Sequence, residues 1–194
     1  MNGELEDGYG IQTLTNGDRY EGEWKNGKKD GKGVQTWTNG DRYEGEWKNG
    51  QKDGKGVQIL AKGSRYDGQF KNNVYEGQGT YFYKNGNKYS GAMKNGNFNG
   101  KGVFTYADGS RYEGNFKEDA FDGSGVRFYA DGDKYDGQWR NDKKHGNGVL
   151  TLANGNRFEG NWQDGTRNPN GYLYCPSGMQ WNGHIDDKLM NSAR

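Results

Sequence analysis

The sequence is poor in the residues on which many folds depend, and each shortage excludes a class of protein. A single cysteine, Cys175, excludes a disulfide framework and a cysteine-rich metal site. No apolar run approaches the ~20 residues of a membrane-spanning helix, and the opening residues, MNGELED, do not resemble a signal peptide. Lys and Arg number 27 against 26 Asp and Glu, so no bulk positive charge is present to bind nucleic acid. We therefore expect a cytoplasmic chain that is not secreted and has no transmembrane segment.

Aliphatic residues are also scarce. Only 29% of the chain is hydrophobic, too little for the large core of a conventional globular domain. Disorder is a poor alternative, because the formal net charge is +1 and 14% of the residues are aromatic. The chain has 36 glycines and 2 prolines, but no three-residue glycine period of the collagen type. We therefore expect an ordered chain with a small hydrophobic core.

An aromatic residue followed two positions later by glycine recurs every 23 residues. The series is Tyr20, Tyr43, Tyr66, Tyr89, Tyr112, Tyr135, Phe158 and Trp181. We number positions within each repeat from this residue, as position 0. Every glycine except Gly3 then falls at position 2, 7, 11, 13 or 20. Such strict periodicity is typical of a repeat architecture in which each unit packs on its neighbours.

Each repeat is predicted to form a β-hairpin. Arg19–Lys25 alternates apolar or small residues with charged ones, as a half-exposed strand does, and Val34–Trp37 is rich in strand-forming residues. Asn39–Gly40 is a dipeptide that favours a tight hairpin turn, whereas Asn26–Gly31 is predicted to be a longer, looser connection. Helical periodicity is not apparent in any segment, so we expect an all-β chain.

Alternation predicts that large rings gather on one face of the sheet. Positions 0 and 4 supply this structural ladder, in which cross-strand ring contacts stabilise neighbouring repeats. Its members are Tyr20, Tyr43, Tyr66, Tyr89, Tyr112, Tyr135, Phe158 and Trp181 at position 0, and Trp24, Trp47, Phe70, Phe116, Trp139 and Trp162 at position 4. Basic residues such as Arg19 and acidic residues such as Glu21 face the opposite side, where we expect a solubility and register role.

The unit Tyr20–Val34 closely resembles the MORN (membrane occupation and recognition nexus) repeat, with its Tyr-x-Gly-x-Trp motif and later Gly-x-Gly. The resemblance spans residues 8–185. It implies an elongated, single-layer antiparallel sheet of consecutive hairpins, twisted or curved. We divide the chain into an N-terminal half-repeat or cap (1–19), seven complete repeats (20–180) and a C-terminal partial repeat with a tail (181–194). Members of this family are scaffolds in cytoskeletal, ciliary or membrane-associated assemblies, so the resemblance implies a non-enzymatic protein–protein interaction role.

The middle repeats differ from the others at position 9, where Tyr75, Phe98 and Phe121 replace basic residues. The outer repeats have Lys29, Lys52, Lys144 and Arg167 there. We interpret position 9 as part of the long hairpin connection, where a lysine would be solvated. Two readings stay open: the three aromatic side chains pack locally, or they form an apolar strip that binds a partner. Neighbouring strands carry further candidates for that strip, namely Tyr81, Tyr83, Phe104, Tyr106 and Tyr129.

The sequence offers no constellation for catalysis, and we expect no enzyme activity, cofactor or metal. His145 is predicted to be a turn residue, His184 lies on the last strand, and Cys175 fills a position held elsewhere by apolar residues. The expected partner is a protein, for example an amphipathic helix or peptide. Alternatives are a homodimer formed through terminal strands and, with weaker support, binding of anionic lipid through lysine-rich loops.

Overall fold

The computed structural model describes residues 7–192, in which the chain forms antiparallel β-hairpins and one short helix. It divides between Asn97 and Phe98 into two compact units. The first unit holds β1 (Gly8–Thr13), β2 (Arg19–Lys25), β3 (Lys28–Thr36), β4 (Arg42–Lys48), β5 (Gln51–Ile59), β6 (Arg65–Lys71), β7 (Val74–Phe82) and β8 (Lys88–Lys94). The second holds β9 (Asn97–Thr105), β10 (Arg111–Lys117), β11 (Ala120–Phe128), β12 (Lys134–Arg140), β13 (Lys143–Thr151), β14 (Arg157–Gln163), β15 (Thr166–Tyr174), β16 (Gln180–His184) and α1 (Asp187–Ser192).

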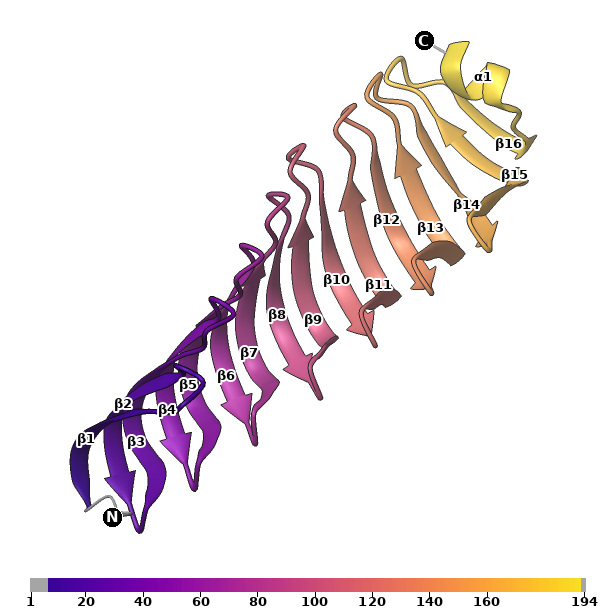
Figure 1. Cartoon of the computed structure of the whole chain (residues 1–194). Helices are drawn as coiled ribbons and strands as arrows, with labels where there is room; N and C mark the ends of the chain where they lie inside the picture. Colours follow the sequence, from indigo (N-terminus) through magenta and orange to yellow (C-terminus); the bar gives the residue numbers. More distant parts are fainter. Residues whose placement is uncertain (1–6, 193–194) are drawn as a thin grey trace. The chain divides into compact units, whose positions relative to one another are not determined.

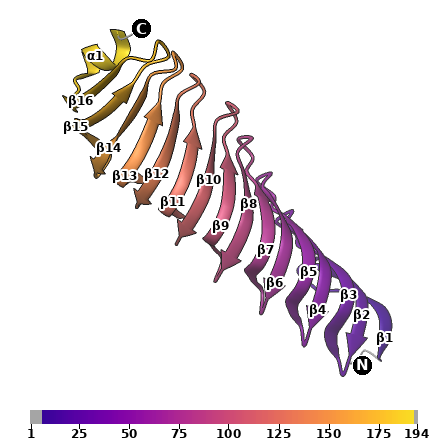
Figure 2. The same ribbon diagram turned by 180° about the vertical axis from the view of Figure 1, so that it is seen from behind.

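Within each unit the strand order follows the chain, and each strand pairs with the one before it. Figures 1 and 2 show this order from opposite sides, with each sheet as a single layer. The prediction of an all-β, single-layer sheet of consecutive hairpins is confirmed. In the described part of the chain, no helix is long and apolar enough to span a membrane.

The two kinds of hairpin connection are the reverse of those predicted. The connection from β2 to β3 is the tight one: only Asn26 and Gly27 lie between the strands, with φ of 50° and 68°. The connection from β3 to β4 is longer, because Gly40 N–H donates to Trp37 C=O (2.9 Å) while Trp37 N–H donates to Asp41 C=O (2.9 Å). In that connection only Gly40 has positive φ (91°), as in a type I turn followed by a left-handed residue.

A β-bulge explains the glycine at position 11 in the repeats that begin at residues 20, 43, 66, 112 and 135. In the first such repeat, β2 and β3 pair Gly22 with Gly33 but Trp24 with Lys29, so β3 has additional residues between its paired positions. Gly31 lies in this segment with φ of 97°, and a Cβ there would be 2.9 Å from the Glu23 Cβ. Only glycine meets both conditions without strain.

The glycines at positions 2 and 13 leave room for the ladder tyrosine of their own repeat. The Tyr20 ring lies over Gly33, where a Cβ would be 2.5 Å from the Tyr20 Cζ atom. The Tyr20 hydroxyl then donates to the Glu23 carbonyl (3.0 Å). Burial, followed by the nearby carboxylates of Glu23 and Asp30, raises the pKa of Tyr20 to about 12.

Candidate functional site

The ladder side chains form one face of each sheet, which we call the aromatic face. Position 0 is buried from Tyr20 to Phe158, at 0 to 2% exposure, whereas Trp181 on the last strand is half-buried. The rings meet edge to face: Tyr20 lies 5.0 Å from Trp24 and 5.4 Å from Trp47. Because Trp47 belongs to the next repeat, these contacts join one hairpin to the next. Buried position-4 members are Trp24, Trp47, Phe70, Phe116, Trp139 and Trp162.

The opposite face of each sheet, the polar face, holds the predicted ion pairs. Arg42 Nη2 lies 2.6 Å from Glu44 Oε2, and Arg65 Nη2 lies 2.6 Å from Asp67 Oδ2. All four side chains are well exposed, so each pair contributes little to stability.

Lysine at position 9 is not solvated, and position 9 does not lie in a loop. Lys29 is in β3 and Lys52 in β5, and both are half-buried on the aromatic face. Lys52 Nζ lies 5.5 Å from the Tyr43 ring centre and donates to Gln58 Oε1 (2.7 Å); Lys29 Nζ lies 4.8 Å from the Tyr20 ring centre and bonds Gln35. Burial lowers the pKa of both ammonium groups. Position 9 is therefore a packing position over the ladder.

The three aromatic residues at position 9 also pack on the ladder. Tyr75, in β7, is half-buried and stacks on Tyr66 with ring centres 4.0 Å apart. Phe121, in β11, is 8% exposed and stacks on Tyr112 at 3.7 Å. Phe98, in β9, is 6% exposed. Their placement in an exposed loop is thus wrong, and Phe98 and Phe121 offer little surface to a partner.

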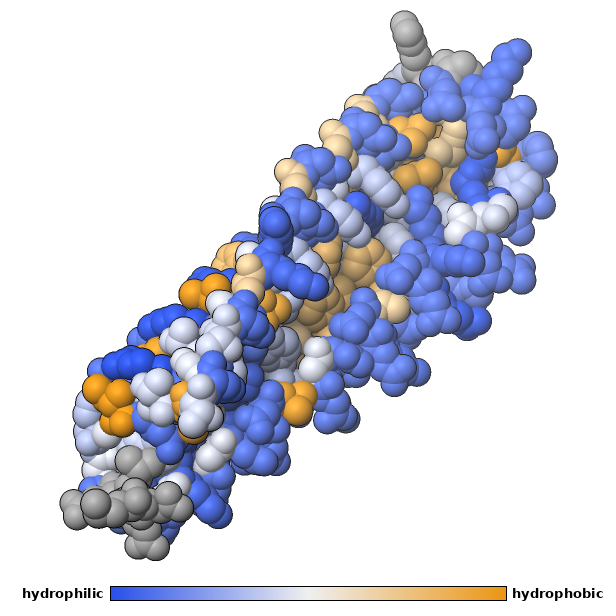
Figure 3. Space-filling view, in the orientation of Figure 1, coloured by the Kyte–Doolittle hydropathy of each residue, from blue (hydrophilic) through white to orange (hydrophobic). Residues whose placement is uncertain are grey.

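The neighbouring candidates of the strip keep more of their surface exposed. Tyr81 and Tyr83 of the first unit are half-buried, with ring centres 4.7 Å apart. In the second unit Phe104 and Tyr106 are half-buried at 4.8 Å, and the Arg127 guanidinium lies 3.9 Å from the Tyr106 ring centre. Tyr129, whose ring centre lies 5.3 Å from the Arg127 guanidinium, is half-buried too. Figure 3 shows apolar surface between polar margins over strands of the second unit.

The helix α1 was not predicted, because six residues are too few to show a helical period. It lies on the second unit near β14 and β15 (Figure 1). Ile185 just before it and Met190 within it are 1% and 3% exposed. Arg167 donates to Ile185 C=O (2.9 Å) and Asp187 Oδ1 (2.7 Å), and Asn156 Nδ2 donates to Met190 C=O (2.8 Å). The signal that could have found it is Asp186, whose Oδ1 accepts the Leu189 N–H (2.7 Å) as an N-cap does.

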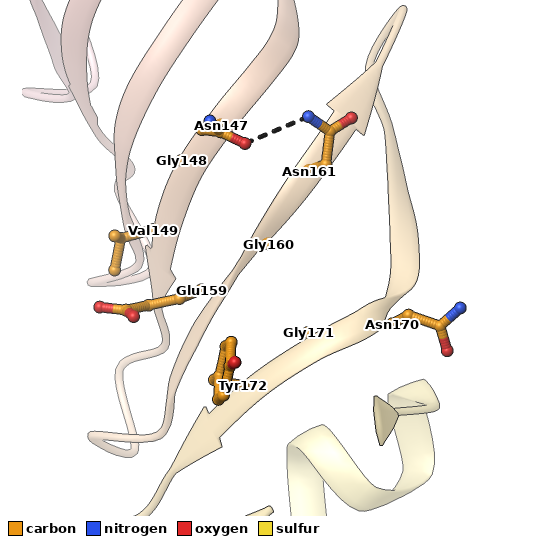
Figure 4. Close-up of a pocket in the computed structure, with 9 residues that line it drawn as sticks. All are labelled: Asn147, Gly148, Val149, Glu159, Gly160, Asn161, Asn170, Gly171 and Tyr172. Carbon is orange, nitrogen blue, oxygen red and sulfur yellow. Dashed lines mark hydrogen bonds between the residues drawn. The ribbon is translucent and has the colours of Figure 1, made fainter. Parts of the chain in front are cut away.

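A shallow hollow of about 560 Å³ lies on the polar face of β13–β15 (Figure 4). Gly148, Gly160 and Gly171 form its floor, and Asn161 Nδ2 donates to Asn147 Oδ1 (3.3 Å) at its side. Its lining has one carboxylate, which belongs to Glu159 and is paired with Arg157. A lone, paired carboxylate does not form an acid–base pair.

The histidines and the cysteine lie on or beside strands. His145 is in β13, not in a turn as predicted, and Cys175 is buried. Among residues 7–192, no group of three or more His, Cys, Asp and Glu side chains is arranged to hold a metal ion.

The model of the MORN repeat family matches residues 5–19, 20–42, 43–65, 66–88, 89–111, 112–134, 135–157 and 158–180. The chain therefore belongs to the MORN repeat family. No curated protein matches it.

Among solved structures, the chain is similar to the TCP domain of SAS-4 (dCPAP) in complex with a proline-rich motif of Ana2 (dSTIL) from Drosophila melanogaster. That match has a TM-score of 0.50 and 11% identity, and covers 89% of this chain and 87% of the other. It is also similar to the TCP10c domain of Drosophila melanogaster Sas-4, with a TM-score of 0.49, 11% identity and coverage of 92% and 99%. At such identities the likeness concerns the fold alone.

Proposed function

We propose that this chain is a non-enzymatic scaffold that binds a protein partner on its aromatic face, within a cytoplasmic assembly of the cytoskeletal, ciliary or membrane-associated kind. The observation that carries this proposal is the set of half-buried rings on that face. A chain that is only 29% hydrophobic still leaves Tyr81 and Tyr83 partly exposed in one unit, and Phe104, Tyr106 and Tyr129 in the other. Clustered, partly exposed aromatic residues are typical of protein interfaces.

Two further facts support a binding role. The first is membership of the MORN repeat family, because a scaffold role is expected of that family. The other is the similar SAS-4 TCP domain, a sheet of this fold that is described in complex with a proline-rich protein segment. The polar face is a weaker candidate, because its exposed charges pair with one another, as Arg42 does with Glu44.

Position 15 provides a sharp test. The aromatic face carries Gln35 and Gln58 at this position in two repeats, and Tyr81 and Phe104 in two others. Replacing Tyr81→Gln together with Phe104→Gln should therefore preserve the fold while removing apolar surface. We expect affinity capture from source lysate, followed by mass spectrometry, to lose the partner in this variant.

The matched control changes the polar face. Phe82 and Phe128 occupy position 16, where Thr36 and Thr105 stand in other repeats, and Phe82 is 37% exposed. Phe82→Thr with Phe128→Thr should still capture the partner. Loss of capture in the polar-face variant, with capture retained by the aromatic-face variant, would refute the proposal. Sedimentation of both variants would detect the alternative of a homodimer.

A further inference from the structure

We infer that one repeat of the first unit binds a short helix of defined chemistry: an apolar residue before the helix, an acidic first turn, and an apolar residue in the last turn. The site consists of Ser64, Tyr75, Tyr81 and Tyr83, which we call the tyrosine seat. This inference rests on the proposed function and names the partner's chemistry. Its template lies within the same chain, where α1 occupies the corresponding positions of the last repeat.

The occupied seat consists of Asn156, Arg167, Leu173 and Cys175, at positions 21, 9, 15 and 17. Asn156 Nδ2 donates to the Met190 carbonyl near the end of α1, and Arg167 donates to the Asp187 carboxylate in its first turn. Leu173 and Cys175 are 0% and 8% exposed. The corresponding residues of the repeat before, Leu150 and Leu152, are only half-buried. We attribute this difference to the segment that carries Ile185 and Met190, whose side chains are themselves 1% and 3% exposed.

The tyrosine seat places Ser64, Tyr75, Tyr81 and Tyr83 at the same four positions. Ser64 is a hydroxyl donor where Asn156 is an amide donor, so it can bond a helix carbonyl in the same way. Tyr75 and Tyr81 are half-buried, and among the described residues their hydroxyls have no hydrogen-bond partner. These two donors can bind a carboxylate in the first turn, as Arg167 binds Asp187. Burial raises the pKa of Tyr75 to about 12, so its hydroxyl remains a donor at neutral pH.

The repeat before it shows why not every repeat can act as a seat. There the four positions hold Asp41, Lys52, Gln58 and Leu60. Lys52 already covers the rings and donates to Gln58 (2.7 Å). Asp41 Oδ1 already accepts the Ala61 N–H (2.8 Å), and its negative charge would repel the carbonyl end of a helix. The tyrosine seat has Tyr75 where that repeat has Lys52, and Ser64 where it has Asp41, so neither group stands at its own positions.

The probe is a fluorescein-labelled peptide of residues 183–192, GHIDDKLMNS, which contains Ile185, Asp187 and Met190. It is titrated by fluorescence anisotropy against the full chain, whose own α1 keeps the last seat occupied. The test variant is Ser64→Asp, Tyr75→Lys and Tyr81→Gln, which reproduces three of the four side chains of the preceding repeat, each of which this fold already packs at that position. We expect affinity to fall at least tenfold in this variant, at unchanged melting temperature.

Two controls fix the interpretation. Phe82→Thr, on the polar face beside the seat, should leave affinity unchanged. A peptide with Ile185→Asp and Met190→Asp should not bind. Equal affinity for wild type and the triple variant, or for both peptides, would overturn the inference. So would a dimer that the peptide dissociates, because the occupant would then be a second copy of this chain.

The experiments distinguish failure of the tyrosine seat from failure of the proposed function. If the peptide does not bind, but the native partner is still lost on Tyr81→Gln with Phe104→Gln, the scaffold role stands and the tyrosine seat is wrong. If the native partner survives that double substitution, the scaffold role on this face is wrong, whatever the peptide does.

Discussion

Tyr43 lies over Gly56 and leaves no room for a side chain at that position. A Cβ built on Gly56 would be 2.5 Å from the Tyr43 Cε2 atom, whereas the Tyr43 hydroxyl donates to the Glu46 carbonyl at 2.9 Å. The Tyr43 ring thus covers the backbone of Gly56, and its hydroxyl is held by a hydrogen bond to a carbonyl of its own strand. The tyrosine–glycine spacing of the repeat follows from this contact.

Gly56→Ala should consequently destabilise the chain by about 3 kcal/mol, because the added methyl group overlaps a ring that is fully buried. Gly50→Ala is the control. Gly50 has φ of 81° but open space around its Cβ position, so only backbone strain of about 1 kcal/mol is expected. Urea denaturation of both variants measures the difference. Equal losses would show that glycine is needed for its conformation and not for the ring.

Much of the fold is predictable from the sequence, and the misses have physical causes. Arg19–Lys25 is a strand with the predicted bounds, because its alternation is complete. The tight and the long connection were predicted in the wrong order, because both contain Asn-Gly, at Asn26 and Asn39. The dipeptide alone does not show which residues close the hairpin. Hydrogen bonds between strands decide that.

The positions of the candidate site residues on the sheet were predicted only in part. Tyr81 and Phe104 lie on the aromatic face, as their alternation with the ladder indicates. Position 9 was placed in a loop, although alternation carried back from Gln35 would have put Lys29 on the aromatic face. The bulge at Gly31 hides that continuity, since a strand that contains two glycines and charged residues resembles a loop.

High pH should unfold the chain through its buried tyrosines. Burial raises the pKa of Tyr20, Tyr66 and Tyr135 to about 12, from the ordinary value of 10.0. The unfolded chain therefore loses these protons first, and stability falls as the pH rises from about 10 to about 12. The buried lysines act in the opposite direction, because their lowered pKa favours folding as the pH rises toward their ordinary value. The tyrosines are more numerous, so we expect a net loss, followed by circular dichroism and tyrosinate absorbance.

Tyr66→Phe tests the cause of this alkaline unfolding. Phe158 already stands at the same position in another repeat, so the ring should pack without the hydroxyl. At neutral pH the variant should lose about 1 kcal/mol, since the hydrogen bond to the Gln69 carbonyl (3.0 Å) is gone. Its stability should then fall less steeply at high pH than that of the wild type. A parallel pH profile for both proteins would contradict the assignment.

Glu118→Asn should stabilise the second unit. Glu118 has φ of 49°, and the corresponding residues Asn26, Asn49 and Asn95 share this left-handed conformation at 50°. Asparagine tolerates that region better than glutamate does, so we expect a gain of about 0.5–1 kcal/mol in urea denaturation. Asp119 should be left unchanged, because its Oδ1 accepts the Phe98 N–H (2.7 Å). Lys117→Gln, an exposed change one residue earlier, should have no effect.

Ile185→Ala should release α1 from its seat without unfolding the first unit. Ile185 is 1% exposed, so truncation removes buried contacts that contribute about 2–4 kcal/mol, and the bonds from Arg167 and Asn156 cannot alone hold a six-residue helix. Amide hydrogen exchange should quicken in α1 and β15 and remain unchanged in β1–β8, because each repeat contacts only its neighbours. Leu189→Ala, at a half-buried position of the same helix, should have a smaller effect.

Faster exchange throughout β1–β8 would mean that the α1 seat stabilises the whole chain and is not a local docking site. That result would remove the template for the tyrosine seat.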